Sequence, residues 1–213
     1  TDVKNARNYT GNTHGSLIEI NGKYYIFYHR HSNRKQSSRQ ACAEQIRFEN
    51  GKFYQAELTS CGLNDGPLRG KGNYPAYIAC NLCGKKGTRF LSMVKHPKSG
   101  YPFFTQKGGD RESGEDQYIA NMCDGAVAGF KYFDLSQTGA VRINIKGKAE
   151  GTVLVRTSEK GETVAEIPVK PCREIHGFSA KLSGLGEKEA LFFSFQGKGA
   201  FDFFSFDLKE DRQ

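Results

Sequence analysis

The amino-acid sequence predicts an all-β protein. Short stretches rich in β-branched and aromatic residues alternate with turns that contain glycine, asparagine or proline, a pattern typical of strands and hairpins. The 213 residues include 25 glycines and 12% aromatic residues, as in globular chains with many turns. No segment shows a convincing helical period. The length fits one large or two small domains, and we expect two.

The chain opens with a predicted β-hairpin. Residues 17–20 and 24–28 are β-branched or aromatic runs, and Asn21-Gly22 between them suits a tight turn with positive φ. A second hairpin is expected from residues 38–48 and 52–58, which flank another Asn-Gly pair. Four strands in about 45 residues are typical of one β-propeller blade. Because a blade buries its faces only against neighbours, this part is expected to come from the middle of a larger domain.

A connector and a β-sandwich are expected to follow. Residues 60–76 are rich in glycine and proline and predict an irregular connector, so we divide the chain into domains 1–72 and 73–213. Alternation resumes around residues 77–82 and 101–105, and a polar loop is expected at 107–116. Eight short strands with turns at regular spacing then predict a sandwich. They are residues 117–122, 126–133, 140–146, 151–157, 163–169, 176–182, 190–196 and 200–208.

The last strand pair is expected to anchor the sandwich core. In the final strand, Phe204 and Phe206 are predicted to face one side, with Ser205 and Asp207 on the other. Burial of each phenylalanine contributes roughly 2–3 kcal/mol.

Two motifs in the first part carry a family resemblance. They are Asn-Thr-His-Gly-Ser at residues 12–16 and Ser-Arg-Gln-Ala-Cys-Ala-Glu at residues 38–44. Over roughly residues 8–80 the chain resembles the last blade of the five-bladed catalytic domain of glycoside hydrolase family 43. The resemblance implies an inverting α-L-arabinofuranosidase or β-xylosidase that acts on arabinoxylan-type hemicellulose.

The resemblance places the catalytic carboxylates on earlier blades. Inverting hydrolysis needs one carboxylic acid and one carboxylate across the scissile bond. Glu19, Glu44 and Glu57 lie in the predicted blade, but none of them matches a catalytic position of the family. We therefore assign no catalytic residue, and we expect this chain alone to be inactive.

A second resemblance covers most of the remainder. From Gln-Tyr-Ile-Ala-Asn-Met-Cys at 117–123 to Phe-Asp-Phe-Phe-Ser-Phe at 201–206, the chain looks like a family 6 carbohydrate-binding module. Two departures weaken its usual sugar cleft: residues 170–174 lack the module's tryptophan, and Ala200 stands where an asparagine is expected. The alternative function is a non-catalytic carbohydrate-binding or purely structural sandwich.

The resemblances imply four site residues. His14 would help to hold a cation such as calcium at the propeller axis, and the alternative is a histidine that caps the start of a strand. Arg39 would contact substrate, or else form a surface salt bridge. Tyr118 would stack on a sugar ring, and Asp202 would help a structural calcium or be a buried hydrogen-bonded carboxylate. His29 and His31 are expected to be solvated.

Charge and cysteine content limit the partners. The net charge is +8, yet the basic residues are scattered, so nucleic acid is not an expected partner. The six cysteines include a lone Cys80-x-x-Cys83 pair, interpreted as ordinary thiols. No signal peptide or membrane span is expected. The compartment stays open, with a secreted or cell-surface location favoured. Expected partners are a plant cell-wall polysaccharide, the remaining propeller, or another copy of the chain.

Overall fold

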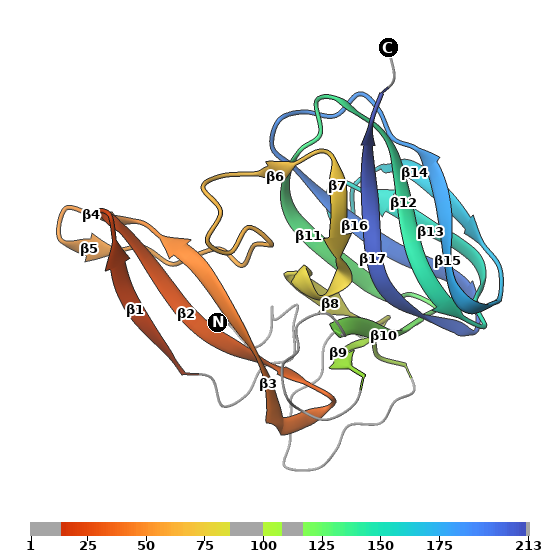
Figure 1. Cartoon of the computed structure of the whole chain (residues 1–213), viewed down its shortest axis with the longest axis horizontal. Coiled ribbons are helices and arrows are strands. Elements are labelled where there is room, and N and C mark those ends of the chain that lie inside the picture. Colours follow the sequence, from red (N-terminus) through yellow and green to blue (C-terminus); the bar gives the residue numbers. More distant parts are fainter. Residues whose placement is uncertain (1–13, 86–99, 108–116, 212–213) are drawn as a thin grey trace.

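The computed structural model describes residues 14–85, 100–107 and 117–211. Its first part is an antiparallel sheet of β1 (Gly15–Ile20), β2 (Lys23–Ser32) and β3 (Lys35–Ile46), in that order (Figure 1). The turn between β1 and β2 has φ of 52° at Asn21 and 76° at Gly22. These left-handed values are those of the predicted tight turn, so the first hairpin is confirmed.

The predicted fourth blade strand is wrong in extent. Instead of a strand over residues 52–58, a separate two-stranded sheet pairs β4 (Phe48–Glu49) with β5 (Lys52–Phe53). Beyond this hairpin the chain leaves the blade and runs to the sandwich, where Glu57 contacts Lys131 and Tyr132. Those contacts compete with further pairing in the blade.

The second part is a sandwich of two six-stranded sheets. The first sheet has the order β15-β12-β17-β10-β9, with β7 also paired to β17, and the second has the order β14-β13-β16-β11-β6, with β8 also paired to β11 (Figure 1). The eight predicted strands are all present. They are β10 (Gln117–Cys123), β11 (Val127–Asp134), β12 (Thr138–Gly147), β13 (Glu150–Arg156), β14 (Thr163–Val169), β15 (Cys172–Lys181), β16 (Glu189–Lys198) and β17 (Ala200–Glu210).

Four short strands complete these sheets, and part of the expected connector supplies two of them. β6 (Leu68–Arg69) pairs parallel with β11, and β7 (Gly72–Pro75) pairs with β17. The others are β8 (Asn81–Cys83) and β9 (Phe103–Gln106). A 3-10 turn, η2 (Ala76–Ile78), is the only helical element among the described residues. The expected loop at 107–116 lies outside them, apart from Lys107.

The core between the two sheets is phenylalanine-rich. Phe130 and Phe193 meet Phe206 with ring centroids 4.8 and 5.2 Å apart. The prediction that Phe204 shares this side is wrong. The register between β12 and β17 shifts between Asn144–Ser205 and Ile145–Phe203, so Phe204 is an extra, bulged residue. It therefore faces outward while Phe206 is buried.

Candidate functional site

Tyr118 lies on the outer face of the first sheet. Its ring stacks on that of the bulged Phe204, with centroids 4.8 Å apart and an interplanar angle of 21°. Both rings are half-buried, and the Lys107 ammonium lies 5.9 Å from the Phe204 ring. Burial, together with the nearby charge of Asp202, raises the pKa of the Tyr118 hydroxyl. Tyr118 therefore stays neutral near pH 7 and presents an apolar ring with a polar tip, a combination suited to sugars.

Asp202 holds a bulge of the same sheet. Its Oδ1 atom accepts a hydrogen bond of 3.1 Å from the main-chain nitrogen of Asn121. Asn121 has φ of 62° and lies where the register between β10 and β17 shifts. Within the described residues, His, Cys, Asp and Glu form no group of three or more that could hold a metal. The calcium sites expected at His14 and Asp202 therefore stay predictions.

His14 lies exposed just before β1, in a row of imidazoles. Its ring packs edge-on against His29, with centroids 4.8 Å apart, and His29 lies 5.7 Å from His31. The expectation that His31 is solvated is wrong, because this side chain is only 3% exposed. β2 continues through both histidines to Ser32, so they belong to the strand and not to a solvated loop after it.

Arg39 lies on β3 directly opposite His31. Its Nε atom is buried and has no hydrogen-bond partner in the described part of the chain. Because side chains alternate along a strand, Arg39 points away from the face that carries Gln40. Gln40 donates to Gln117 of β10 at 2.6 Å, so that other face meets the sandwich. The structure therefore groups Arg39 with the histidines, and Tyr118 with Asp202, on different parts of the chain.

Sequence reasoning missed the residue that joins the two parts. The Arg30 guanidinium lies 3.5 Å from the centre of the Phe104 ring. It donates to the main-chain oxygens of Tyr77 and Ala79 and, through Nε, to Gln40 Oε1 at 2.9 Å. Burial lowers the pKa of Arg30. The available signal was its position in the alternation of β2, on the same face as Tyr28 and Ser32.

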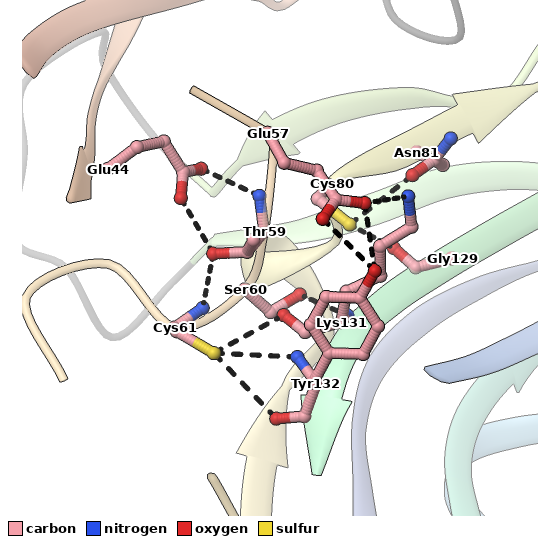
Figure 2. Close-up of polar contacts among 10 residues, drawn as sticks. All are labelled: Glu44, Glu57, Thr59, Ser60, Cys61, Cys80, Asn81, Gly129, Lys131 and Tyr132. Carbon is pink, nitrogen blue, oxygen red and sulfur yellow. Dashed lines mark hydrogen bonds and ion pairs between the residues drawn. The ribbon is translucent and has the colours of Figure 1, made fainter. Parts of the chain in front are cut away.

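A second polar contact joins the blade to residues 57–61 (Figure 2). The buried Glu44 carboxylate accepts hydrogen bonds from the Thr59 main-chain nitrogen at 2.7 Å and hydroxyl at 2.6 Å. Tyr28 donates to the same carboxylate at 3.2 Å. Burial outweighs these hydrogen bonds and raises the pKa of Glu44. Glu44 is therefore a structural acceptor in this arrangement.

Glu57 continues this contact to the sandwich (Figure 2). Its carboxylate lies 3.0 Å from the Lys131 ammonium and 2.9 Å from the Tyr132 hydroxyl. Burial alone would raise the pKa of Glu57, but the hydrogen bonds from these two residues lower it overall. Burial, together with Glu57, raises the pKa of Tyr132 to about 12. Glu44 and Glu57 are thus both engaged in joining parts of the chain.

None of the six cysteines, all of which lie in the described part of the chain, forms a disulfide. Cys61 lies at the second contact, where its Sγ atom is 3.6 Å from the Lys131 main-chain oxygen. Burial raises the pKa of Cys80 to about 12. Cys80 and Cys83 therefore fit the interpretation as ordinary thiols. Among the described residues no helix is long and apolar enough to cross a membrane.

The chain is similar in sequence to a curated protein. No family model matches the chain. A curated protein of Thermoclostridium stercorarium named "Xylosidase/arabinosidase" is 45% identical over 207 residues. The match covers 95% of this chain but 43% of the relative, so the chain spans less than half of that protein.

Solved structures show the fold. A family 43 arabinoxylan arabinofuranohydrolase from Bacillus subtilis has a TM-score of 0.61 at 15% identity, over 94% of this chain and 41% of its own. The module CsCBM6-3 from Clostridium stercorarium has a TM-score of 0.53 at 15% identity, over 68% of this chain and 98% of its own. Together the comparisons confirm the resemblance to the C-terminal part of a family 43 glycoside hydrolase followed by a family 6-like module.

Proposed function

We propose that this chain is part of a glycoside hydrolase of the α-L-arabinofuranosidase or β-xylosidase type that acts on hemicellulose. The observation that carries the proposal is the 45% identity over 207 residues to a protein named as such an enzyme. The blade contributes one wall of a propeller, and the sandwich is an accessory module that contacts the polysaccharide. The carboxylates that cleave the glycosidic bond come from other blades, because Glu44 and Glu57 are engaged in structural contacts.

The exposed side of the blade supports this assignment. Five large apolar side chains of β1 and the β4–β5 hairpin are at least 40% exposed: Leu17, Ile18, Ile20, Phe48 and Phe53. A group of exposed apolar side chains in one part of a protein is characteristic of surfaces that pack against another part. We propose that neighbouring blades of the same enzyme cover them.

A sugar contact at Tyr118 is the second element of the proposal. Carbohydrate-binding modules with the same sandwich fold were solved with cellobiose or described as binding β-1,3-glucan. In this chain the stacked Tyr118 and Phe204 rings form an apolar surface where a pyranose face can pack. If the sandwich acted on its own, the chain would be a binding module, which is the alternative function.

Two assays test the proposal. The complete enzyme should release arabinose or xylose from arabinoxylan, whereas the 213-residue chain alone should bind the polymer without cleaving it. Affinity electrophoresis in gels containing arabinoxylan should retard this chain, and Tyr118→Ala should remove most of the retardation. Tyr54→Ala, a tyrosine substitution in the blade, is the matched control. A complete enzyme that folds but cleaves no hemicellulose would refute the proposal.

A further inference from the structure

The outer face of the first sandwich sheet carries three exposed cations side by side. β15, β12 and β17 are neighbouring strands (Figure 1). Lys181 and Lys209 lie on either side of Ala140 in the register of these strands. Arg142 is the next outward-facing residue of β12, and all three basic side chains are exposed. We call Arg142, Lys181 and Lys209 the basic row.

Arg142 is held away from the carboxylate directly opposite it. Asp207 is its cross-strand neighbour, yet the two Asp207 oxygens accept hydrogen bonds from the amides of Asn73 and Asn144 at 2.9 and 2.8 Å. The Arg142 side chain lies instead across Gly177 of β15, where an added Cβ would be 1.7 Å from Arg142 Nε. Only glycine leaves room for the side chain in this position. The guanidinium therefore lies over Gly177 on the outer face of the sheet.

The basic row has no partner within the described residues. No side-chain hydrogen bond or ion pair in residues 14–85, 100–107 and 117–211 involves any of its three members. Lysines at the margins of the same sheet are paired, since Lys146 lies 3.7 Å from Glu174 and Lys71 lies 2.9 Å from Glu210. Unpaired cations on one face of a sheet create a positive potential that attracts an anionic ligand.

The surface around the basic row is flat and polar. The outward-facing neighbours on these strands are small, namely Ala140, Gly177, Ser179 and Ser205. Asn73 and Asn144 use their amide nitrogens on Ser205 and Asp207, which leaves their carbonyl oxygens for other donors. Tyr118 and Phe204 lie on the same outer face. A sugar chain can thus lie against the strands with amide oxygens available to its hydroxyl groups.

We propose that the basic row binds the carboxylate of a uronic acid in an acidic hemicellulose chain. A guanidinium presents a planar fork that matches a carboxylate with two hydrogen bonds, and the two lysines add charge on one side of it. The Asp207 carboxylate lies directly opposite Arg142 on the neighbouring strand, where its negative charge would repel a continuous phosphate backbone. We therefore assign the site to a sparsely charged saccharide. The inference rests on the proposed function for the class of polymer.

Isothermal titration of the 213-residue chain with two matched polymers tests the site. One is xylan substituted with glucuronic acid, and the other is neutral arabinoxylan. The triple variant R142Q/K181Q/K209Q should lose about tenfold in affinity for the acidic polymer, because it removes three exposed charges that face the carboxylate. Its affinity for the neutral polymer should be unchanged. The control variant K160Q/K198Q removes exposed lysines outside this face and should behave like the unaltered chain.

The outcomes separate this inference from the proposed function. Equal affinities of the triple variant and the unaltered chain for acidic xylan would overturn the basic row as a uronate site. Equal binding of duplex DNA and acidic xylan, with the same dependence on salt, would overturn its assignment to a saccharide. An unaltered chain that binds acidic xylan but not neutral arabinoxylan would instead contradict the proposed accessory role of the sandwich. That result would leave the uronate site in place.

Discussion

Arg30 is the single residue on which the contact between blade and sandwich depends most. Its guanidinium is desolvated, and among the described residues its charge is stabilised by main-chain oxygens, by Gln40 and by the Phe104 ring. Such a cation is costly to bury, so its hydrogen bonds must all be made in the folded state. This requirement fixes the position of β2 relative to η2 and β9.

We predict that Arg30→Met destabilises the chain by about 2–4 kcal/mol, because the Tyr77 and Ala79 oxygens lose their donors in a buried contact. Urea unfolding followed by circular dichroism measures the change. Arg173→Met, on the exposed part of β15, is the control and should stay within about 0.5 kcal/mol. An equal effect of both variants would show that Arg30 has no special role.

Glu44 gives a prediction with a defined pH dependence. Its pKa is raised from 4.5 by burial, so the folded state binds this proton more tightly than the unfolded state. The contribution of Glu44 to the free energy of unfolding is therefore fully present below pH 4.5 and decreases as pH rises through the raised value.

Glu44→Gln removes this titration. Relative to the unaltered chain, the variant should gain stability between pH 4 and pH 7 in urea unfolding experiments. Glu166→Gln, an exposed substitution on β14, is the control and should leave the pH profile unchanged. Parallel profiles for Glu44→Gln and the unaltered chain would contradict the account.

The burial and contacts of single residues are only partly predictable from the sequence. Tyr118 was identified by its motif, and the structure places it against an aromatic ring. Arg30 was missed because the face of β2 that meets the sandwich depends on contacts 47 and 49 residues away along the chain. His31 was misjudged because β2 extends beyond the apolar run that predicted it. In both cases the tertiary contacts, not the local sequence, decide the burial.

At the scale of elements, hydrophobic alternation was a reliable guide to the eight long strands of the sandwich. The short strands were not predictable. β6 has only two residues and β7 only four, too few for a periodic signal, and β7 also contains glycine and proline. The outward orientation of Phe204 was also hidden, because a bulge reverses the alternation after Phe203 and only the pairing with β12 reveals it.

The β4–β5 hairpin leads to a prediction about association. The rings of Tyr24, Phe48 and Phe53 pack together, yet Phe48 and Phe53 remain 41% and 40% exposed. We expect the isolated chain to self-associate through this surface. Phe48→Ser combined with Phe53→Ser should lower the sedimentation-derived association constant by about tenfold or more.

Ile175→Ser is the matched control, because Ile175 is 50% exposed but lies on the sandwich. It should leave association unchanged. If the control dissociates the chain as effectively as the hairpin variant, the sandwich and not the blade forms the contact between copies.

At the scale of the whole molecule, the described residues of the blade and the sandwich meet at several places. The Arg30 contact joins β2 to η2 and β9, and Glu44 and Glu57 tie residues 57–61 to both parts (Figure 2). One face of the blade is therefore occupied by the sandwich, while the exposed apolar side chains of β1, β4 and β5 remain open. This arrangement is expected if the open side of the blade belongs to a larger propeller.

The most direct test of this account is a complementation assay on arabinoxylan. This chain is mixed with the separately produced remaining part of the enzyme, and released arabinose and xylose are measured by chromatography. We predict that neither part releases sugar alone, that the mixture does, and that the hairpin variant Phe48→Ser/Phe53→Ser weakens the recovery. Sugar release by this chain alone, or no recovery from two folded parts that bind each other, would contradict the account.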